Sequence, residues 1–146
     1  MTNVIMHGCN GKMGQMIAGL IADDPEITIV AGVDAFDEGK NPFPVFKNIG
    51  ECTVKADAII DFSVAAAVDG LLDYCVKEQV PCVLCTTGLT EKQLQKVKDA
   101  SKKVAILKSA NMSLGINMLL KLLKERQQQR LFLQALMWKL LKSIIS

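Results

Sequence analysis

Short apolar runs alternate with amphipathic segments along most of this chain. The expected strands are residues 4–7, 27–33, 58–62, 80–85 and 104–107. The expected helices are residues 12–23, 64–79 and 90–102, and Val68, Leu71, Leu72 and Cys75 form the buried stripe of the second. Continuous apolar strands separated by amphipathic helices predict an α/β fold in which a parallel sheet is covered on both faces.

Two local signals refine this outline. Thr90 and Gln93 have the spacing of a capping box, which predicts the start of the third helix. Residues 35–55 contain two prolines and two glycines, so this segment is expected to be loop with little regular structure.

The turn after the first strand is rich in glycine. Gly8, Gly11 and Gly14 follow that strand and open the first helix, and Asp34 ends the next strand 20 residues after the last glycine. In a dinucleotide-binding turn one glycine allows the tight turn, another lets a pyrophosphate approach the backbone, and a third lets helix pack on strand. The pattern predicts a dinucleotide site in a Rossmann-like, doubly wound sheet. The alternative is a glycine-rich turn that binds no ligand.

The position of Asp34 bears on the choice of cofactor. A carboxylate there would accept hydrogen bonds from the adenosine ribose hydroxyls and repel a 2′-phosphate, and Ala35 offers no compensating cation. The cofactor is therefore expected to be NAD(P)H with NADH favoured. Lys40, the nearest downstream cation, would weaken that preference if it reached the phosphate.

Three more polar turns follow expected strands, at residues 62–63, 85–88 and 109–112. The carboxyl ends of parallel strands line the ligand crevice of a doubly wound sheet. Hydroxyl, amide and backbone groups at these turns suit a nicotinamide ribose and carboxamide, while the alternative is ordinary β-turn chemistry.

Together, Gly8–Gly14, Asp61–Ser63, Thr86–Gly88 and Ser109–Gly115 resemble the 4-hydroxy-tetrahydrodipicolinate reductase (dihydrodipicolinate reductase) family of bacterial lysine and diaminopimelate biosynthesis. The resemblance runs from residue 1 to about residue 125. Cys85 stands where that family usually has glycine, and Met112 stands where it usually has phenylalanine.

The resemblance implies an NAD(P)H-dependent oxidoreductase that forms tetrahydrodipicolinate, with a small-molecule substrate bound only by the intact family member. It also implies the residues that contact the dinucleotide. These are Gly8, Cys9, Asn10, Gly11, Lys12, Met13, Asp34, Cys85, Thr86, Thr87, Ser109, Ala110, Asn111 and Met112.

The family's substrate domain carries a Glu-x-His-His signature and a later lysine, and this chain does not contain that signature. Its one histidine, His7, lies on the first strand and is interpreted as a structural residue. No catalytic residue is therefore assigned. We expect residues 1–115 to form the dinucleotide-binding domain and the chain to be inactive alone.

Residues 116–146 are expected to form a helical tail in place of the substrate domain. One permitted back-translation of residues 126–146, read two bases later, contains Glu-x-His-His, so the tail is interpreted as out of frame after about residue 125. The alternative takes it as a basic amphipathic helix that binds a membrane surface or an acidic protein. The chain would then be a dinucleotide sensor or interaction module.

The amino-acid composition excludes several classes of protein and of binding partner. Half of the 146 residues are hydrophobic and 22% are charged, which excludes a disordered chain. Aromatic residues make up 5% and the net charge is +2, so no nucleic-acid partner is expected. Five cysteines, an odd number at irregular spacing, indicate a reducing cytoplasm. Cys82 and Cys85 should point to opposite faces of one strand, so no metal site is expected.

Overall fold

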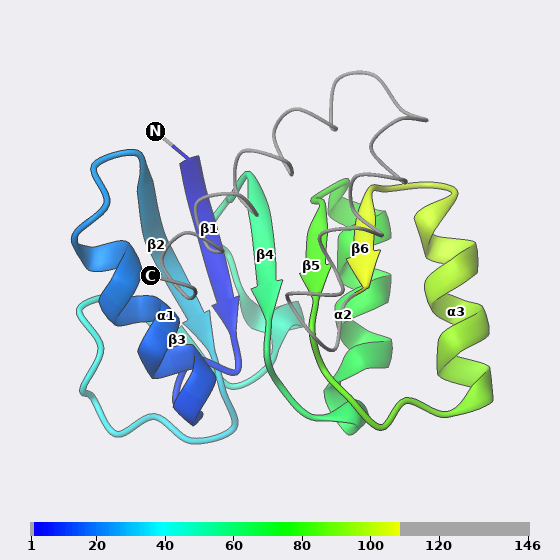
Figure 1. Cartoon of the computed structure of the whole chain (residues 1–146), viewed down its shortest axis with the longest axis horizontal. Helices are drawn as coiled ribbons and strands as arrows, with labels where there is room; N and C mark the ends of the chain where they lie inside the picture. The colour runs from blue at the N-terminus through cyan, green and yellow to red at the C-terminus, as the bar shows by residue number, and fades with distance from the viewer. Residues whose placement is uncertain (1, 109–146) are drawn as a thin grey trace.

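The computed structural model describes residues 2–108 as a sheet with helices on both faces (Figure 1). Its elements are β1 (Thr2–His7), α1 (Lys12–Ala22), β2 (Ile27–Val33), β3 (Val45–Phe46), η1 (Ile49–Glu51), β4 (Ala58–Asp61), α2 (Ala65–Glu78), β5 (Cys82–Leu84), α3 (Glu91–Ser101) and β6 (Ile106–Lys108). The alternation that the hydrophobic pattern predicts is confirmed, and strands and helices lie close to the expected residues.

The six strands form one parallel sheet in the order β3-β2-β1-β4-β5-β6. β1 is central, with β2 on one side and β4 on the other. The chain therefore builds the sheet outward in one direction from β1 to β3, and in the opposite direction from β4 to β6. In sheets of this kind, ligands bind at the carboxyl ends of the strands where the direction changes.

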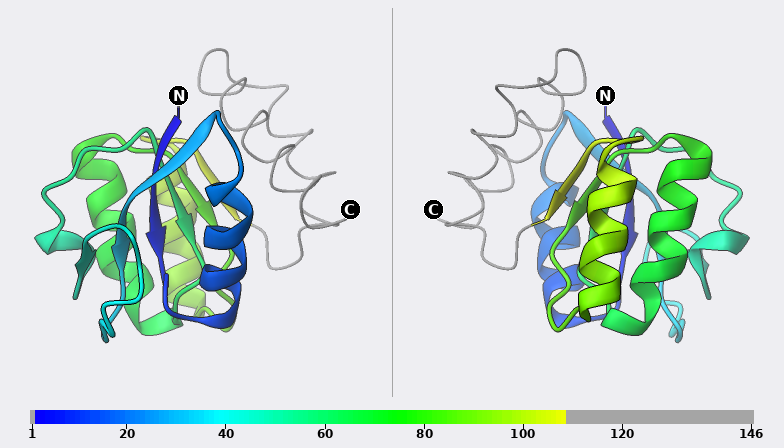
Figure 2. Two further views of the ribbon diagram at one scale, coloured as in Figure 1. Left: turned by 90° about the vertical axis from the view of Figure 1, so that its left-hand side faces the viewer. Right: turned by 90° about the vertical axis from the view of Figure 1, so that its right-hand side faces the viewer.

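The helices are divided between the two faces of the sheet, with α1 on one and α2 and α3 on the other (Figure 2). Alternate strand residues feed two separate cores because successive side chains point to opposite faces. Met6 and Ile60 lie in the core under α1, whereas Ile5 and Ile59 lie in the core under α2 and α3. This arrangement confirms the Rossmann-like, doubly wound fold.

The buried stripe of α2 is as expected, with Val68, Leu71, Leu72 and Cys75 buried. The capping box is also present: the Thr90 hydroxyl accepts a hydrogen bond from the backbone N–H of Gln93, and the Gln93 side chain accepts one from the backbone N–H of Thr90. Gln93 in addition donates to the Ala65 carbonyl, 2.6 Å away, so the start of α3 is tied to the start of α2.

The segment expected to be loop contains two short regular elements, β3 and η1. β3 pairs only Val45 with Gly32 and Phe46 with Val33. A strand of two residues has too few positions to show an alternating pattern, and flanking prolines normally indicate a turn. The rest of residues 35–55 forms no helix or strand, as expected.

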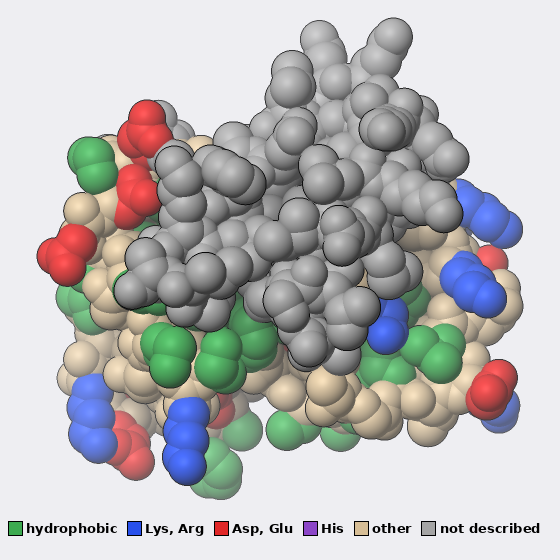
Figure 3. Space-filling view, viewed as in Figure 1, with side chains coloured by type: hydrophobic (Ala, Val, Ile, Leu, Met, Phe, Trp, Pro, Cys, Tyr) green, Lys and Arg blue, Asp and Glu red, His purple; other side chains and the backbone are tan. Residues whose placement is uncertain are grey.

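Charged side chains of both signs lie around the visible periphery of the described domain (Figure 3). One group connects the two helices on the same face: Lys96 of α3 lies 3.0 Å from the Asp73 carboxylate and 3.5 Å from the Asp69 carboxylate of α2.

Within residues 2–108, none of the helices has the length and apolar character that a membrane crossing requires. The expected contacts at residues 109–112 and the expected tail lie outside the described residues.

Candidate functional site

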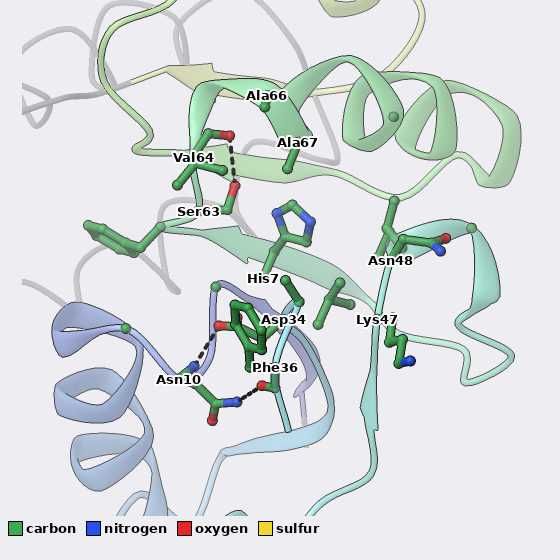
Figure 4. A pocket seen from close by; sticks show the side chains of 18 of the residues that line it. His7, Asn10, Asp34, Phe36, Lys47, Asn48, Ser63, Val64, Ala66 and Ala67 are labelled. Atoms are coloured by element: carbon green, nitrogen blue, oxygen red, sulfur yellow. Dashed lines mark hydrogen bonds between the residues drawn. The ribbon is translucent and has the colours of Figure 1, made fainter. Parts of the chain in front are cut away.

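A cavity of about 940 Å³ opens at the carboxyl ends of β1, β2 and β4. The glycine turn lines one side of the cavity together with the segment after β2, which contributes Asp34 and Phe36 (Figure 4). The segment between β3 and η1 and the first turns of α2 complete the lining. The cavity thus lies at the reversal of strand order, where the fold predicts a ligand.

The three glycines of the turn have different neighbours. Gly8 has φ +81°, and a Cβ atom on it would lie 2.4 Å from the carbonyl oxygen of Phe62. A Cβ on Gly14 would lie 2.2 Å from the carbonyl oxygen of Gly8. Both positions therefore require glycine for the protein's own packing.

Gly11 differs from the other two. Its φ is −71°, and within the described part of the chain a Cβ on it would meet only the Gly8 carbonyl oxygen, at an ordinary contact distance of 3.5 Å. The fold does not require glycine here, yet Gly11 lines the cavity. Because glycine has no side chain, a ligand can approach the backbone closely at this position. A bound pyrophosphate requires such a close approach.

Gly11 is also the N-cap of α1. Among residues 2–108, no side chain forms a capping hydrogen bond at this end of the helix, and the first turn contains no acidic residue. The first N–H groups of a helix lack partners within the helix, and they carry partial positive charge. This end of α1 is therefore suited to an anion such as a phosphate group.

Asp34 follows β2 directly and lines the cavity. Its Oδ2 accepts a hydrogen bond of 3.0 Å from the backbone N–H of Asn10. The side chain is half-buried, and within residues 2–108 its Oδ1 forms no hydrogen bond. One carboxylate oxygen thus fixes the glycine turn while the other remains available to a ligand.

Amide side chains join the glycine turn to the segment after β2. The Asn10 side chain donates to the carbonyl of Phe36 and accepts 2.8 Å from the Asn41 amide. Gln15 of α1 donates to Asn41 Oδ1 at 3.0 Å and to the Cys9 carbonyl at 2.8 Å. These bonds tie the glycine turn and α1 to the segment after β2.

A second, buried polar cluster lies beside the cavity, around Asp61 at the end of β4. Asp61 Oδ1 lies 2.7 Å from His7 Nδ1 and accepts from the Ser63 hydroxyl at 2.6 Å. Asp61 Oδ2 accepts from the Thr86 hydroxyl at 2.6 Å. Asp61 is fully buried, and His7 and Thr86 are nearly so.

Burial alone would raise the pKa of Asp61. The opposing effects together are larger: the hydrogen bond and charge of His7, and the hydroxyl donors Ser63 and Thr86, place the pKa of Asp61 below its ordinary value. Asp61 is therefore a carboxylate at neutral pH. It links the ends of β1, β4 and β5.

Two large apolar side chains stand at the rim of the cavity. Phe36 is 77% exposed and Val64 is 66% exposed, and both line the opening from opposite walls. Small residues of α2, namely Ala66, Ala67 and Gly70, leave room between them. The rim can therefore hold a flat apolar group such as a base.

The structure brings together four of the expected dinucleotide contacts, because Gly8, Asn10, Gly11 and Asp34 all line the cavity. Lys12 and Met13 lie in the first turn of α1, and neither lines the cavity. The Cys9 side chain is buried in the core under α1.

The expected contacts after β5 lie apart from this cavity. Cys85 and Thr86 are buried, Thr87 is exposed, and none of the three lines it. Ser109, Ala110, Asn111 and Met112 lie outside the described residues.

All five cysteines are buried without a disulfide. Burial raises the pKa of Cys9 to about 11 and that of Cys85 to about 12, so both remain thiols at neutral pH. Cys82 packs in the core under α2 and α3 and Cys85 in the core under α1, so the two point to opposite faces as expected. Among residues 2–108 no three metal-ligating side chains gather at one point.

Sequence reasoning missed several residues of the cavity. Lys47, Asn48 and Ile49 reach it from the segment expected to be loop, where no periodic signal was available. Ala66, Ala67 and Gly70 recur at helical spacing on the face of α2 opposite to part of its buried stripe, where Ala66 and Gly70 are exposed. A run of such small residues on one helix face is the signal that could have indicated space for a ligand there.

Comparison with known proteins identifies relatives over most of the chain. The family model described as dihydrodipicolinate reductase, N-terminus, matches residues 2–112. The 4-hydroxy-tetrahydrodipicolinate reductase of Clostridium novyi (strain NT) is 46% identical over 125 residues, which cover 86% of this chain and 50% of the relative. The enzyme of the same name from Caldanaerobacter subterraneus subsp. tengcongensis is 46% identical over 129 residues, which cover 86% and 49%.

Comparison with solved structures identifies the same family. Dipicolinate-bound dihydrodipicolinate reductase from Paenisporosarcina sp. TG-14 matches with a TM-score of 0.68 and 26% identity, over 84% of this chain and 52% of that one. Myo-inositol 2-dehydrogenase from Lactobacillus plantarum, at 15% identity, 74% and 36% coverage and a TM-score of 0.61, shares the fold alone. The chain spans about half the length of the curated relatives it matches. Because the family model covers more than half of it, the chain belongs to the dihydrodipicolinate reductase family through that family's N-terminal domain.

Proposed function

We propose that this chain supplies the NAD(P)H-binding half of a reductase that forms tetrahydrodipicolinate in lysine and diaminopimelate biosynthesis. The observation that carries the proposal is the contrast within the glycine turn. Gly8 and Gly14 are required by packing, whereas Gly11 leaves backbone open to the cavity at the uncapped start of α1. Membership of the family supports the reaction.

The residues of the turn suit the pyrophosphate, and Asp34 suits the adenosine ribose. We propose that Cys85–Thr87 and Ser109–Met112 serve the nicotinamide end, as the resemblance implies. The dinucleotide supplies the hydride when bound, while the protein orients it. Residues 1–115 would constitute the dinucleotide-binding domain.

We further propose that NADH is favoured over NADPH. A 2′-phosphate would approach the carboxylate of Asp34, whose Oδ2 is already held by Asn10. Lys40 is paired with Glu38 at the exposed surface, which keeps that cation from compensating. Lys47 lines the cavity and is the group that would reduce the preference.

Titration of the 146-residue chain with NADH and NADPH tests this preference. NADH should bind more tightly, and Asp34→Asn should reduce the difference because it removes the charge but keeps the shape of the side chain. Lys47→Gln serves as the opposite control and should enlarge the difference. Equal affinity of the wild-type chain for both cofactors would contradict the preference.

We propose that the chain alone does not turn over. Its one histidine, His7, is hydrogen-bonded to Asp61 in the dinucleotide-binding domain, and the sequence carries no Glu-x-His-His signature for the substrate. An assay with the cyclic substrate and NADH should show binding of the cofactor without its oxidation. Measurable turnover by the pure chain would contradict this.

We propose that residues beyond about 125 are read out of frame, and sequencing the gene from the Lys121 codon past the stop tests this. Meaningless alternative frames would favour the sensor or interaction module instead. A cytoplasmic location is proposed on the support of five buried thiols without a disulfide, and fractionation of the source cells tests it.

A further inference from the structure

Phe36 is a large aromatic side chain that the fold does not bury. Among residues 2–108, the large apolar side chains that are mostly exposed are Met16, Phe36 and Val64. Met16 does not line the cavity, whereas Phe36 and Val64 both do. Because 77% of Phe36 is exposed, its ring contributes little to the protein's own packing. An aromatic ring that lines a cavity in this way is available to a ligand.

The position of Phe36 is fixed through its main chain and not through its ring. The Asn10 side chain donates to the Phe36 carbonyl, and the backbone N–H of Asn10 donates to Asp34 Oδ2 at 3.0 Å (Figure 4). Asn41 in turn donates to the Asn10 side-chain oxygen at 2.8 Å. The glycine turn thus holds both Phe36 and the carboxylate that is proposed to bind the adenosine ribose.

The base of a dinucleotide is joined directly to that ribose, so a base bound in this cavity must lie close to Asp34. Phe36 follows Asp34 by two residues and lines the same cavity. On the α2 side the lining is small, and within the described chain a Cβ added to Gly70 would meet nothing within 4 Å. The cavity therefore has room for a purine ring beside Phe36, and an aromatic ring can stack on the face of any base.

Recognition of the edge of a base requires polar side chains that are not already engaged. Within residues 2–108, the segments after β2 and after its neighbour β3 contribute these polar side chains to the lining: Asp34, Glu38, Lys47 and Asn48. The Asn48 side chain accepts from the Glu51 N–H at 3.2 Å and donates to the Glu51 carboxylate at 2.8 Å. Glu38 is paired with Lys40, and Asp34 is assigned to the ribose. Lys47 is then the group left to meet the base.

Lys47 is poorly suited to distinguish one purine from another. Adenine carries an amino group where hypoxanthine carries a carbonyl oxygen, and a matched amide such as that of asparagine reads adenine through this amino group and N7 together. An ammonium group only donates, and N7 of either purine can accept from it. The lining thus offers the base a ring face and no group matched to the edge of adenine.

We propose that Phe36 is the base-binding residue of this cavity and that it recognises a purine by stacking on its face, so that dinucleotides containing adenine and hypoxanthine bind alike. The inference rests on the proposed function. It adds to that function a specific residue and a breadth of base acceptance.

Titration of the 146-residue chain with NADH and with reduced nicotinamide hypoxanthine dinucleotide tests the breadth. The two affinities should agree within about threefold, because stacking tolerates any base. A preference for NADH of about tenfold or more, which a matched contact to the base edge would provide, would overturn recognition through the face.

Substitution of Phe36 tests the residue. Phe36→Ala should weaken binding of both dinucleotides by the same factor, at least about tenfold, whereas Phe36→Tyr keeps the ring and should retain the affinity. Every variant keeps the main-chain carbonyl that Asn10 binds, and the exposed side chain makes a loss of folding unexpected. Met16→Ala is the matched control, because it removes an exposed apolar side chain outside the cavity and should leave both affinities unchanged. Wild-type affinity in Phe36→Ala would overturn the inference.

Phe36→Trp provides a spectroscopic signature of the stack. ADP-ribose contains the base and the pyrophosphate but no nicotinamide, and its binding should quench the fluorescence of a tryptophan at this position. The wild-type chain, whose one tryptophan is Trp138, gives the background signal. Calorimetric binding of ADP-ribose to Phe36→Trp without quenching beyond this background would overturn this inference alone. Failure of the wild-type chain to bind ADP-ribose or NADH would contradict the proposed function as well.

Discussion

Two aspartates flank the end of β1, and they are used in opposite ways. Asp61 is fully buried, and its two oxygens accept from His7, Ser63 and Thr86. Asp34 is half-buried, and one of its oxygens accepts from the Asn10 backbone. Asp34 directly follows β2 and Asp61 is the last residue of β4, so both lie at the same edge of the sheet. A position at the carboxyl edge of the sheet therefore does not by itself make a carboxylate a ligand group, because its hydrogen-bond partners decide whether an oxygen is available.

Removal of each carboxylate in turn should separate the structural role of Asp61 from the binding role of Asp34. Asp61→Ala should lower the free energy of unfolding by about 3–5 kcal/mol, because it leaves His7 and two hydroxyls without their acceptor in a buried place. Asp34→Ala should cost about 1 kcal/mol, since one backbone N–H loses its partner at a half-exposed site. Urea unfolding at neutral pH measures both. Equal losses would contradict the division between a structural and a binding carboxylate.

The glycine turn likewise contains one position required for the fold, Gly8, and one that is open to a ligand, Gly11. Gly8→Ala should cost at least about 2 kcal/mol, because φ is +81° and the added Cβ would lie 2.4 Å from the Phe62 oxygen. Gly11→Ala should lower the free energy of unfolding by no more than about 1 kcal/mol, because its φ of −71° suits any residue and alanine is only a poorer N-cap. Its affinity for ADP-ribose should fall at least tenfold. A Gly11→Ala chain that binds ADP-ribose normally would show that the ligand does not approach there.

The contribution of Asp61 to stability should also be measurable from the pH dependence of the free energy of unfolding. The pKa of Asp61 is lower in the folded chain than its ordinary value, so its ionisation stabilises the fold at pH values above the unfolded pKa of about 4. That contribution is lost as pH falls through the folded pKa. Urea unfolding between pH 7 and acid should show a decline that Asp61→Asn makes shallower. An identical decline in Asp61→Asn would place the acid-sensitive group elsewhere.

Thr90, which does not line the cavity, provides a reference for stability without binding. Thr90→Ala removes the side-chain cap of α3 and should cost about 1 kcal/mol, with no change in ADP-ribose affinity. If this variant also weakened binding, the stability and ligand effects at Asp34 and Gly11 would no longer be separable. Thermal unfolding and one calorimetric titration are sufficient.

Much of the fold is predictable from the sequence because its signals are local. The buried stripe of α2, the Thr90 capping box and the turn from Gly8 to Gly14 each depend on residues within a few positions of one another. β3 was not predicted, since Val45 and Phe46 form a strand only through Gly32 and Val33, more than ten residues away. A local sequence pattern depends on the residues of the strand itself and contains no information about the distant strand with which it pairs.

In the candidate site, too, local features were predictable from the sequence and contacts between distant segments were not. Asp34 is marked by its distance from the last glycine, so the sequence indicates its place in the cavity. The Asp61 cluster depends on residues 7, 61 and 86, which meet only when β1, β4 and β5 lie side by side. His7 could be placed at a strand end, but neither its carboxylate partner nor its position in the cavity wall follows from spacing.

The brevity of β3 has a consequence for the edge of the sheet. An exposed edge strand offers unpaired backbone groups to a strand of another molecule, which is a route to aggregation. Here that edge is two residues long and lies just after Pro42 and Pro44, neither of which has a backbone N–H to donate. The carbonyl of Pro44 is already directed inward, to the N–H of Gly32. A segment that contributes little to the sheet's own hydrogen bonding thus limits lateral growth of the sheet at this side.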